Sequence, residues 1–143
     1  MFATTTATVA APIEKVWAVV ADHEGMANWG PGKGLKVELL QAGTTERNGV
    51  GAVRKISPAG PGPSIVEKVT VFDAPNRLQY TAVSGVPLKG YFGDIELKQT
   101  DAGTEIVYKI SATERVPFVE KLACKSISAV LLALLVKQVK RES

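Results

Sequence analysis

Apolar and polar positions follow two different periods along this chain, and the change from one to the other predicts most of its elements. In the first part, apolar side chains recur at the spacing of one helix face. These side chains are Ile13, Val16, Trp17 and Val20. Pro12 precedes them and suits the first turn of a helix, so we expect a helix over residues 12–22. Residues 2–10, rich in threonine and small side chains, predict a strand before it, and residues 23–29 predict a short second helix or turn after it.

From residue 35 onward the pattern alternates with period two, which is typical of strands with one buried face. Short breaks rich in glycine, proline, asparagine and aspartate separate the alternating runs, as at Asn48-Gly49 and Asp101-Ala102-Gly103. Short connections of this kind join antiparallel neighbours. We therefore expect antiparallel strands at residues 35–42, 50–57, 64–73, 77–84, 88–100 and 104–114.

The end of the chain, from Phe118 to about Arg141, contains neither glycine nor proline and predicts one long helix, opened by Pro117. An antiparallel sheet of about seven strands must curl, and its concave face needs a cover. The closing helix is the one predicted element of sufficient length. The sequence therefore predicts an α+β fold, in which a curved antiparallel sheet wraps around the C-terminal helix. Two short helices follow the first strand, and one domain spans residues 1–143.

Composition narrows the class of protein. Of the 143 residues, 45% are hydrophobic and 22% charged, as in an ordinary folded domain. The net charge of +3 is spread among acidic residues, so we expect no nucleic-acid binding. Cys124 and His23 are each the only residue of their type, so we expect no disulfide, no metal and no cofactor. Because we find neither a signal peptide nor an apolar run of membrane-spanning length, we expect a cytoplasmic protein without a transmembrane segment.

Several short segments follow one another in a specific order. They are residues 11–17 (Ala-Pro-Ile-Glu-Lys-Val-Trp), Asp22 with Trp29 seven residues later, residues 49–54, residues 69–78 and the closing helix. This order resembles the helix-grip superfamily known as SRPBCC or START-like, and within it the polyketide cyclase/dehydrase-like proteins. The resemblance spans nearly the whole chain. It implies an internal cavity that binds lipids, sterols, polyketides or other aromatic molecules.

Counting outward from the turn at Ala74-Pro75 predicts which side chains share the concave face of the sheet. Val71 then lies opposite Leu78, and Arg54 lies opposite Glu67. The other inward positions are Ala52, Ile56, Val69, Tyr80, Ala82, Tyr91, Gly93, Ile95, Leu97, Tyr108, Ile110 and Ala112. A bulge in any strand would turn its side chains to the other face.

The inward set contains one possible ion pair and three phenol groups. In a functional interpretation, these polar groups anchor the oxygen atoms of a ligand inside an apolar pocket. In a structural interpretation, an internal Arg54–Glu67 pair holds two strands in register and the tyrosines belong to the core. The predicted ligand-binding residues are Arg54, Glu67, Val69, Tyr80, Tyr91, Ile95, Tyr108, Ile110, Leu122 and Trp29. Trp29 is otherwise a core residue or a gate, and His23 is either a solvated residue after a helix or an acid or base at the pocket mouth.

The closing helix carries apolar residues on every side, which is typical of a helix that is buried all round. We expect one face, of small and medium side chains, to lie on the sheet. This face consists of Val119, Leu122, Ala123, Ser126, Val130 and Ala133. The leucines between residues 131 and 136 would then face outward and contact a second copy of the chain, a membrane surface or a protein partner. We expect a homodimer through this helix.

Three functions remain open. The preferred one is the binding, transport or sensing of an apolar small molecule such as a lipid, sterol or aromatic polyketide. By resemblance, the second is a cyclase or dehydratase in which Arg54 and the tyrosines polarise a carbonyl and Glu67 moves a proton. A close Arg54–Glu67 contact would weaken that base, whereas a raised pKa without it would favour the enzyme. The third is a protein–protein adaptor. The loop at residues 84–89 corresponds to a mobile gate in related plant hormone receptors, although a plain turn explains the same residues.

Overall fold

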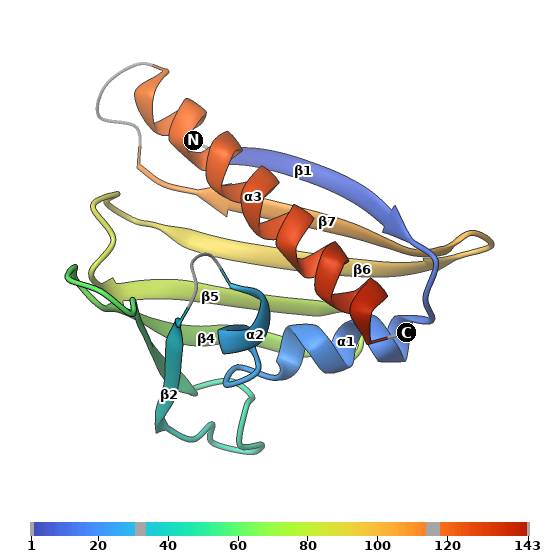
Figure 1. Ribbon diagram of the computed structural model, residues 1–143, viewed down its shortest axis with the longest axis horizontal. Helices are drawn as coiled ribbons and strands as arrows, with labels where there is room; N and C mark the ends of the chain where they lie inside the picture. Colours follow the sequence, from blue (N-terminus) through green and yellow to red (C-terminus); the bar gives the residue numbers. More distant parts are fainter. Residues whose placement is uncertain (1, 31–33, 114–117, 143) are drawn as a thin grey trace.

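The computed structural model describes residues 2–30, 34–113 and 118–142, which form one curved antiparallel sheet with a long helix lying diagonally across it (Figure 1). The strands are β1 (Phe2–Val9), β2 (Lys36–Gln41), β3 (Val53–Ser57), β4 (Ile65–Asp73), β5 (Arg77–Ser84), β6 (Phe92–Thr100) and β7 (Gly103–Ser111). The helices are α1 (Ile13–Ala21), α2 (Met26–Trp29) and α3 (Val119–Arg141). The strand order is β1-β7-β6-β5-β4-β3-β2, so the predicted α+β helix-grip architecture is confirmed.

Two strands, β3 and β6, begin three or four residues later than the sequence predicts. β3 starts at Val53 rather than at residue 50, because Gly51 takes a left-handed φ of 93° that interrupts extended backbone. β6 starts at Phe92 rather than at residue 88, since Pro87 has no N–H to donate and Gly90 has a φ of 68°. The loop between β5 and β6 is therefore longer than expected. Pro117, which we expected to open the last helix, lies outside the described residues.

Among the described strands, the register shifts at three places. Two of them lie between β4 and β5, at Val66/Glu67 and at Val69/Val71, and the second places Phe72 rather than Val71 opposite Leu78. The predicted Val71–Leu78 pair is therefore wrong, and the Phe72 ring packs edge-on against Trp17 at a centroid distance of 5.1 Å. In β2, at the end of the sheet, the third shift falls between Leu39 and Gln41. Bulges add one residue to one strand and bend it locally.

Beyond the β4 bulge, the predicted register of the central strands is confirmed. Arg54 lies opposite Glu67, Val69 opposite Tyr80 and Glu67 opposite Ala82. The inward side chains of β5, β6 and β7 are buried against α3 in one core, with Tyr80 and Tyr108 each 1% exposed. The polar groups predicted for the concave face therefore do lie inside the protein.

The face that α3 turns toward the sheet is not the predicted one. Leu122 is 70% exposed, and Val119 and Val130 also lie outside, whereas Leu131, Leu132 and Leu135, expected to face outward toward a partner, are in the core. The buried stripe consists of Glu120, Cys124, Ser128, Leu131, Leu132, Leu135, Gln138 and Val139. The prediction failed because this stripe contains polar residues with partners inside; the hydroxyl of Ser128, for example, is 2.7 Å from that of Thr5 on β1. The leucine-based argument for a dimer therefore no longer holds.

α3 packs along β1 and β7 and contacts α1 and α2 (Figure 1). Within the part of the chain that the structure describes, no helix combines the length and apolar character needed to cross a membrane. In the same residues, no group of three or more histidine, cysteine or acidic side chains is placed to hold a metal ion.

Candidate functional site

A cavity of about 230 Å³ lies between the concave face of the sheet and α3. Its walls come from α2, β3, β4, β5, the loop before β6 and the middle of α3. The lining residues are Met26, Ile56, Ile65, Glu67, Tyr80, Val86, Pro87, Tyr91, Ile127 and Leu131. Most of these side chains are apolar, and the polar ones belong to β4, β5 and the segment just before β6. The cavity is thus an apolar space with hydrogen-bonding groups from adjacent segments.

The structure brings three of the predicted ligand-binding residues to this cavity, namely Glu67, Tyr80 and Tyr91. Val69, Ile95, Tyr108 and Ile110 are buried, but they lie in the core rather than in the cavity wall. Leu122 is on the outer face of α3, so its predicted position was wrong. Val86 and Pro87 belong to the loop that we considered as a gate. Sequence reasoning missed Met26 and Leu131 as lining residues because it assigned α3 the wrong face and α2 no role.

Arg54 lies behind Glu67 and forms a buried ion pair with it. The Nε and Nη2 atoms of Arg54 both donate to Oε1 of Glu67, at 3.0 and 2.8 Å. The guanidinium also stacks on the ring of Tyr80, 4.7 Å from its centroid. Both charged side chains are nearly inaccessible. Burial raises the pKa of Glu67, and the charge of Arg54 opposes this increase.

His23 completes the network, and its burial was not predicted. The residue is 0% exposed rather than solvated or at a pocket mouth. Its Nδ1 lies 3.2 Å from Nη1 of Arg54, and its Nε2 lies 2.8 Å from the carbonyl oxygen of Asn48. Since the guanidinium can only donate and the carbonyl can only accept, His23 is neutral with its proton on Nε2. Burial, together with the charge of Arg54, lowers the pKa of His23 to about 4.

The tyrosines form the uncharged part of this buried network. The hydroxyls of Tyr80 and Tyr108 are 2.7 Å apart. Burial raises the pKa of Tyr108 to about 12 and raises that of Tyr91 and Tyr80 as well, so all three phenols stay protonated near neutral pH. Tyr80 fits because its ladder partner on β6 is Gly93, where a Cβ would lie 2.3 Å from the ring carbon Cζ.

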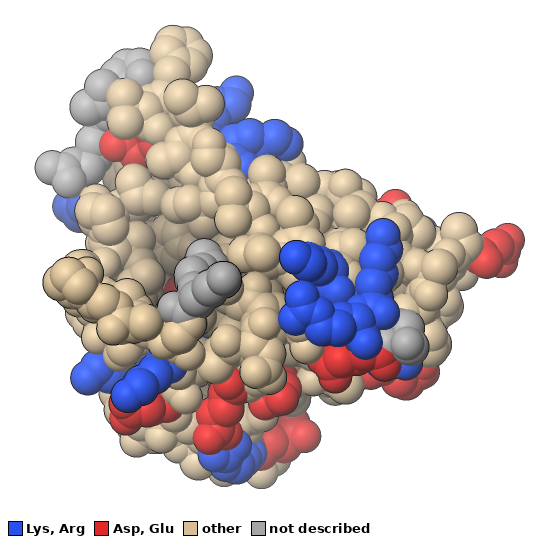
Figure 2. Space-filling view, in the orientation of Figure 1, with Lys and Arg blue, Asp and Glu red and all other residues tan. Residues whose placement is uncertain are grey.

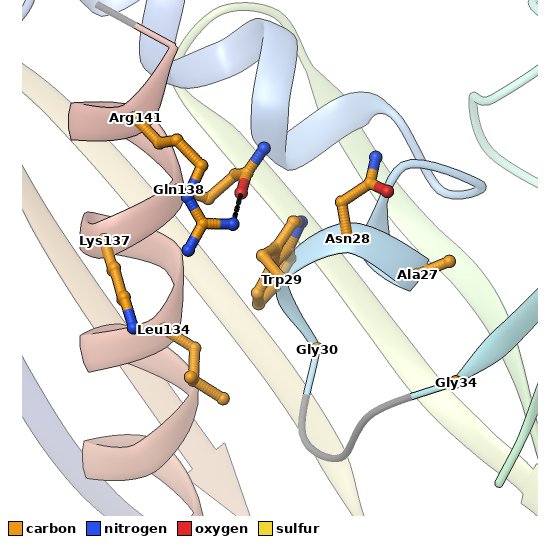
Figure 3. A pocket seen from close by; sticks show the side chains of 9 residues that line it. All are labelled: Ala27, Asn28, Trp29, Gly30, Gly34, Leu134, Lys137, Gln138 and Arg141. Carbon is orange, nitrogen blue, oxygen red and sulfur yellow. Dashed lines mark hydrogen bonds between the residues drawn. The ribbon is translucent and has the colours of Figure 1, made fainter. Parts of the chain in front are cut away.

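A second pocket lies outside the cavity, between α2 and the C-terminal part of α3 (Figure 3). Trp29, predicted as a ligand-binding or gating residue, is buried in its wall, and Gln138 and Arg141 lie across from it (Figure 3). Among the described residues, the indole Nε1 of Trp29 is the buried side-chain polar atom without a hydrogen-bond partner. Lysine and arginine side chains gather near this end of α3 (Figure 2). Trp29 therefore lines this second pocket and not the cavity that Glu67, Tyr80 and Tyr91 line.

The fold agrees with the comparison to known families. A family model described as polyketide cyclase / dehydrase and lipid transport matches residues 3–141. The chain belongs to this family, within the SRPBCC or START-like superfamily that its segments resemble. No curated protein shows significant sequence similarity to the chain.

Solved structures with the same fold cover almost the entire chain. A START superfamily protein from Mycobacterium smegmatis superposes with a TM-score of 0.80 at 16% identity, over 99% of both chains. A protein from Mesorhizobium loti gives a TM-score of 0.78 at 16% identity, over 100% of this chain and 99% of the other. The Aha1 dimer from Colwellia psychrerythraea gives 0.73 at 17% identity, over 97% and 96%. At these identities the likeness shows the fold alone.

Proposed function

We propose that this chain is a single ligand-binding domain, spanning residues 1–143, that holds a small apolar molecule in the cavity beneath α3. One observation carries the proposal: an apolar cavity of about 230 Å³ has its few polar side chains, Glu67, Tyr80 and Tyr91, on neighbouring segments. This is the composition expected of a small-molecule site, in which apolar walls supply affinity and a few polar groups fix orientation.

The size of the cavity limits the ligand. It lies below the roughly 300–1,000 Å³ that is usual for drug-sized ligands. A compact molecule of one or two rings therefore fits better than a sterol or a long-chain lipid. Val86 and Pro87 form part of the wall, so movement of the loop between β5 and β6 would control entry.

The proposal is tested first by native mass spectrometry of freshly purified protein, with extraction of any molecule that is released on unfolding. We expect a compact apolar compound at one copy per chain. A cavity-filling variant, Ile127→Trp, should remove the bound mass because Ile127 lines the cavity from α3.

Leu122→Trp is the matched control, since it adds the same side chain to the same helix at a position that is 70% exposed. This control should keep its ligand. Equal loss in both variants, or no binding of any compact aromatic compound by the original chain, would contradict the proposal.

A cyclase or dehydratase role is the weaker candidate. The family description includes such enzymes, and burial raises the pKa of Glu67 as a proton carrier requires. However, Arg54 donates two hydrogen bonds to Glu67, which stabilise the carboxylate and reduce its strength as a base. Arg54 is not part of the cavity wall, so it does not reach a ligand carbonyl there. Recovery of the extracted ligand chemically unchanged after incubation would favour binding.

A homodimer through α3 remains a proposal with a different set of contacts. The apolar side chains that α3 and its start expose are Phe118, Val119, Leu122 and Val130. An adaptor role would use the same surface, but it leaves the cavity unexplained.

The thiol of Cys124 is free and buried, as suits a reducing compartment such as the cytoplasm.

A further inference from the structure

The positive charge of the buried network is directed away from the cavity. Of the donors on Arg54, Nε and Nη2 bind Glu67 and Nη1 binds His23. One face of the guanidinium rests on the ring of Tyr80. The side chain is 5% exposed and does not line the cavity, and among the described residues no other lysine or arginine lines it either.

A carboxylate group instead lines the cavity. Glu67 is part of the wall, and among the described residues both hydrogen bonds that it accepts end on Oε1. The second oxygen, Oε2, is therefore the one left for an occupant of the cavity. The other polar groups in the wall are the phenols of Tyr80 and Tyr91, and the hydroxyl of Tyr80 is already bonded to that of Tyr108.

We propose that this cavity selects uncharged ligands that carry a hydroxyl or N–H group, such as phenols, and rejects carboxylates of the same shape. The inference rests on the proposed binding function and adds the chemical class of the ligand. A hydroxyl donates to Oε2 of Glu67 and forms a charge-assisted hydrogen bond, the stronger kind. A ligand carboxylate at the same place brings a second negative charge beside Glu67, whose own charge Arg54 already balances, and the described cavity wall holds no further cation to pair with it.

The test uses the unaltered chain and five naphthalene derivatives, whose two rings suit the cavity. These are naphthalene, 2-naphthol, 2-methoxynaphthalene, 2-naphthamide and 2-naphthoate, with dissociation constants measured by calorimetry at pH 7.5. We expect 2-naphthol to bind about 10-fold more tightly than naphthalene or 2-methoxynaphthalene, which lack the donor. We expect 2-naphthamide to bind at least about 10-fold more tightly than 2-naphthoate, which has nearly the same shape and differs in charge.

The outcomes separate this inference from the function on which it rests. If naphthalene binds but 2-naphthoate binds as tightly as 2-naphthamide, the selection is wrong and the cavity still binds ligands. If 2-methoxynaphthalene binds as tightly as 2-naphthol, the proposed hydrogen bond from the ligand hydroxyl to Glu67 is wrong. If none of the five binds, the binding function fails and the inference fails with it.

A variant then tests whether Glu67 causes the selection of neutral ligands over carboxylates. Glu67→Gln removes the charge and keeps the shape, so the ratio between 2-naphthamide and 2-naphthoate should fall by about 10-fold. Glu14→Gln, the control, makes the same substitution at an exposed position on α1 outside the cavity and should leave that ratio unchanged. If Glu67→Gln does not fold because Arg54 loses its partner, the naphthamide–naphthoate comparison on the unaltered chain still decides the proposal. An unchanged ratio in folded Glu67→Gln would overturn the role of Glu67.

Discussion

Replacing Gly93 by alanine tests whether the close approach between Tyr80 and β6 is as tight as the geometry indicates. The added Cβ would lie 2.3 Å from Cζ and 2.4 Å from the hydroxyl oxygen of Tyr80. Carbon atoms pack favourably at about 3.5–4.0 Å, so the ring would have to move by at least about 1 Å.

Tyr80 has little freedom to make that movement. Its ring is stacked on the guanidinium of Arg54, its hydroxyl is bonded to that of Tyr108, and the side chain is 1% exposed. Overpacking of this kind costs about 1–3 kcal/mol, and breaking the phenol–phenol hydrogen bond costs about 1 kcal/mol more. A glycine-to-alanine change also stiffens the unfolded chain, which returns about 0.4–1 kcal/mol. The free energy of unfolding should therefore fall by about 2–3 kcal/mol.

Urea unfolding followed by circular dichroism measures this change through the midpoint, provided that the slope stays constant. Gly60→Ala is the control, because no atom lies within 4 Å of its added Cβ, and it should unfold at the same urea concentration or slightly higher. In a Tyr80→Leu background the clashing ring is absent, so Gly93→Ala should cost at most about 0.5 kcal/mol. A Gly93→Ala protein as stable as the original would refute the reasoning about this contact.

Three further predictions concern α3, His23 and the oligomeric state. Leu135→Ala should lower the unfolding free energy by about 2–5 kcal/mol because Leu135 is fully buried. Leu122→Ala, at an exposed position, should change it by less than about 0.5 kcal/mol. Similar urea midpoints for the two variants would contradict the position of α3. In the folded protein the pKa of His23 is about 4, below the value of 6.5 expected in the unfolded chain. Neutral His23 therefore contributes fully to the free energy of unfolding above pH 6.5, and this contribution is lost as the pH falls through 4. His23→Gln should therefore remove up to about 3 kcal/mol of the pH dependence across this window, and parallel stability curves would exclude the assigned neutral state. If a homodimer forms through α3, Leu122→Glu with Val130→Glu should reduce the sedimenting mass to that of a monomer; a monomer mass for the unaltered chain would rule the dimer out.

The sequence predicts the sheet and part of the network because turn positions and period-two alternation determine ladder partners. Arg54 and Glu67 were paired simply by counting residues across two turns, and their contact is confirmed. Counting residues gave the wrong ladder partner within β4, where the bulge places Phe72 rather than Val71 opposite Leu78. Nothing in the alternation of apolar residues indicates that bulge.

His23 could not be assigned from its local sequence, since a histidine after a short helix is usually solvated. Its burial depends on a tertiary contact, in which the loop carrying Asn48 supplies a carbonyl to the ring and an amide to the end of α1. One signal was present: a buried guanidinium has more donors than Glu67 accepts, so Arg54 required a further acceptor. The face of α3 was missed for a related reason, because Ser128 and Gln138 are polar yet buried.

The sheet does not close on itself, and its two open sides differ in how they would receive another strand. At β1, Lys125 from α3 donates to the carbonyl oxygen of Thr4 at 2.6 Å, so a charged side chain occupies a backbone acceptor of this strand. At β2, the shift between Leu39 and Gln41 interrupts the ladder, and Lys36 and Glu38 place charges along it. Features of this kind hinder edge-to-edge association and the growth of fibrils. These features therefore protect the long antiparallel sheet from pairing, edge to edge, with the sheet of another copy of the chain.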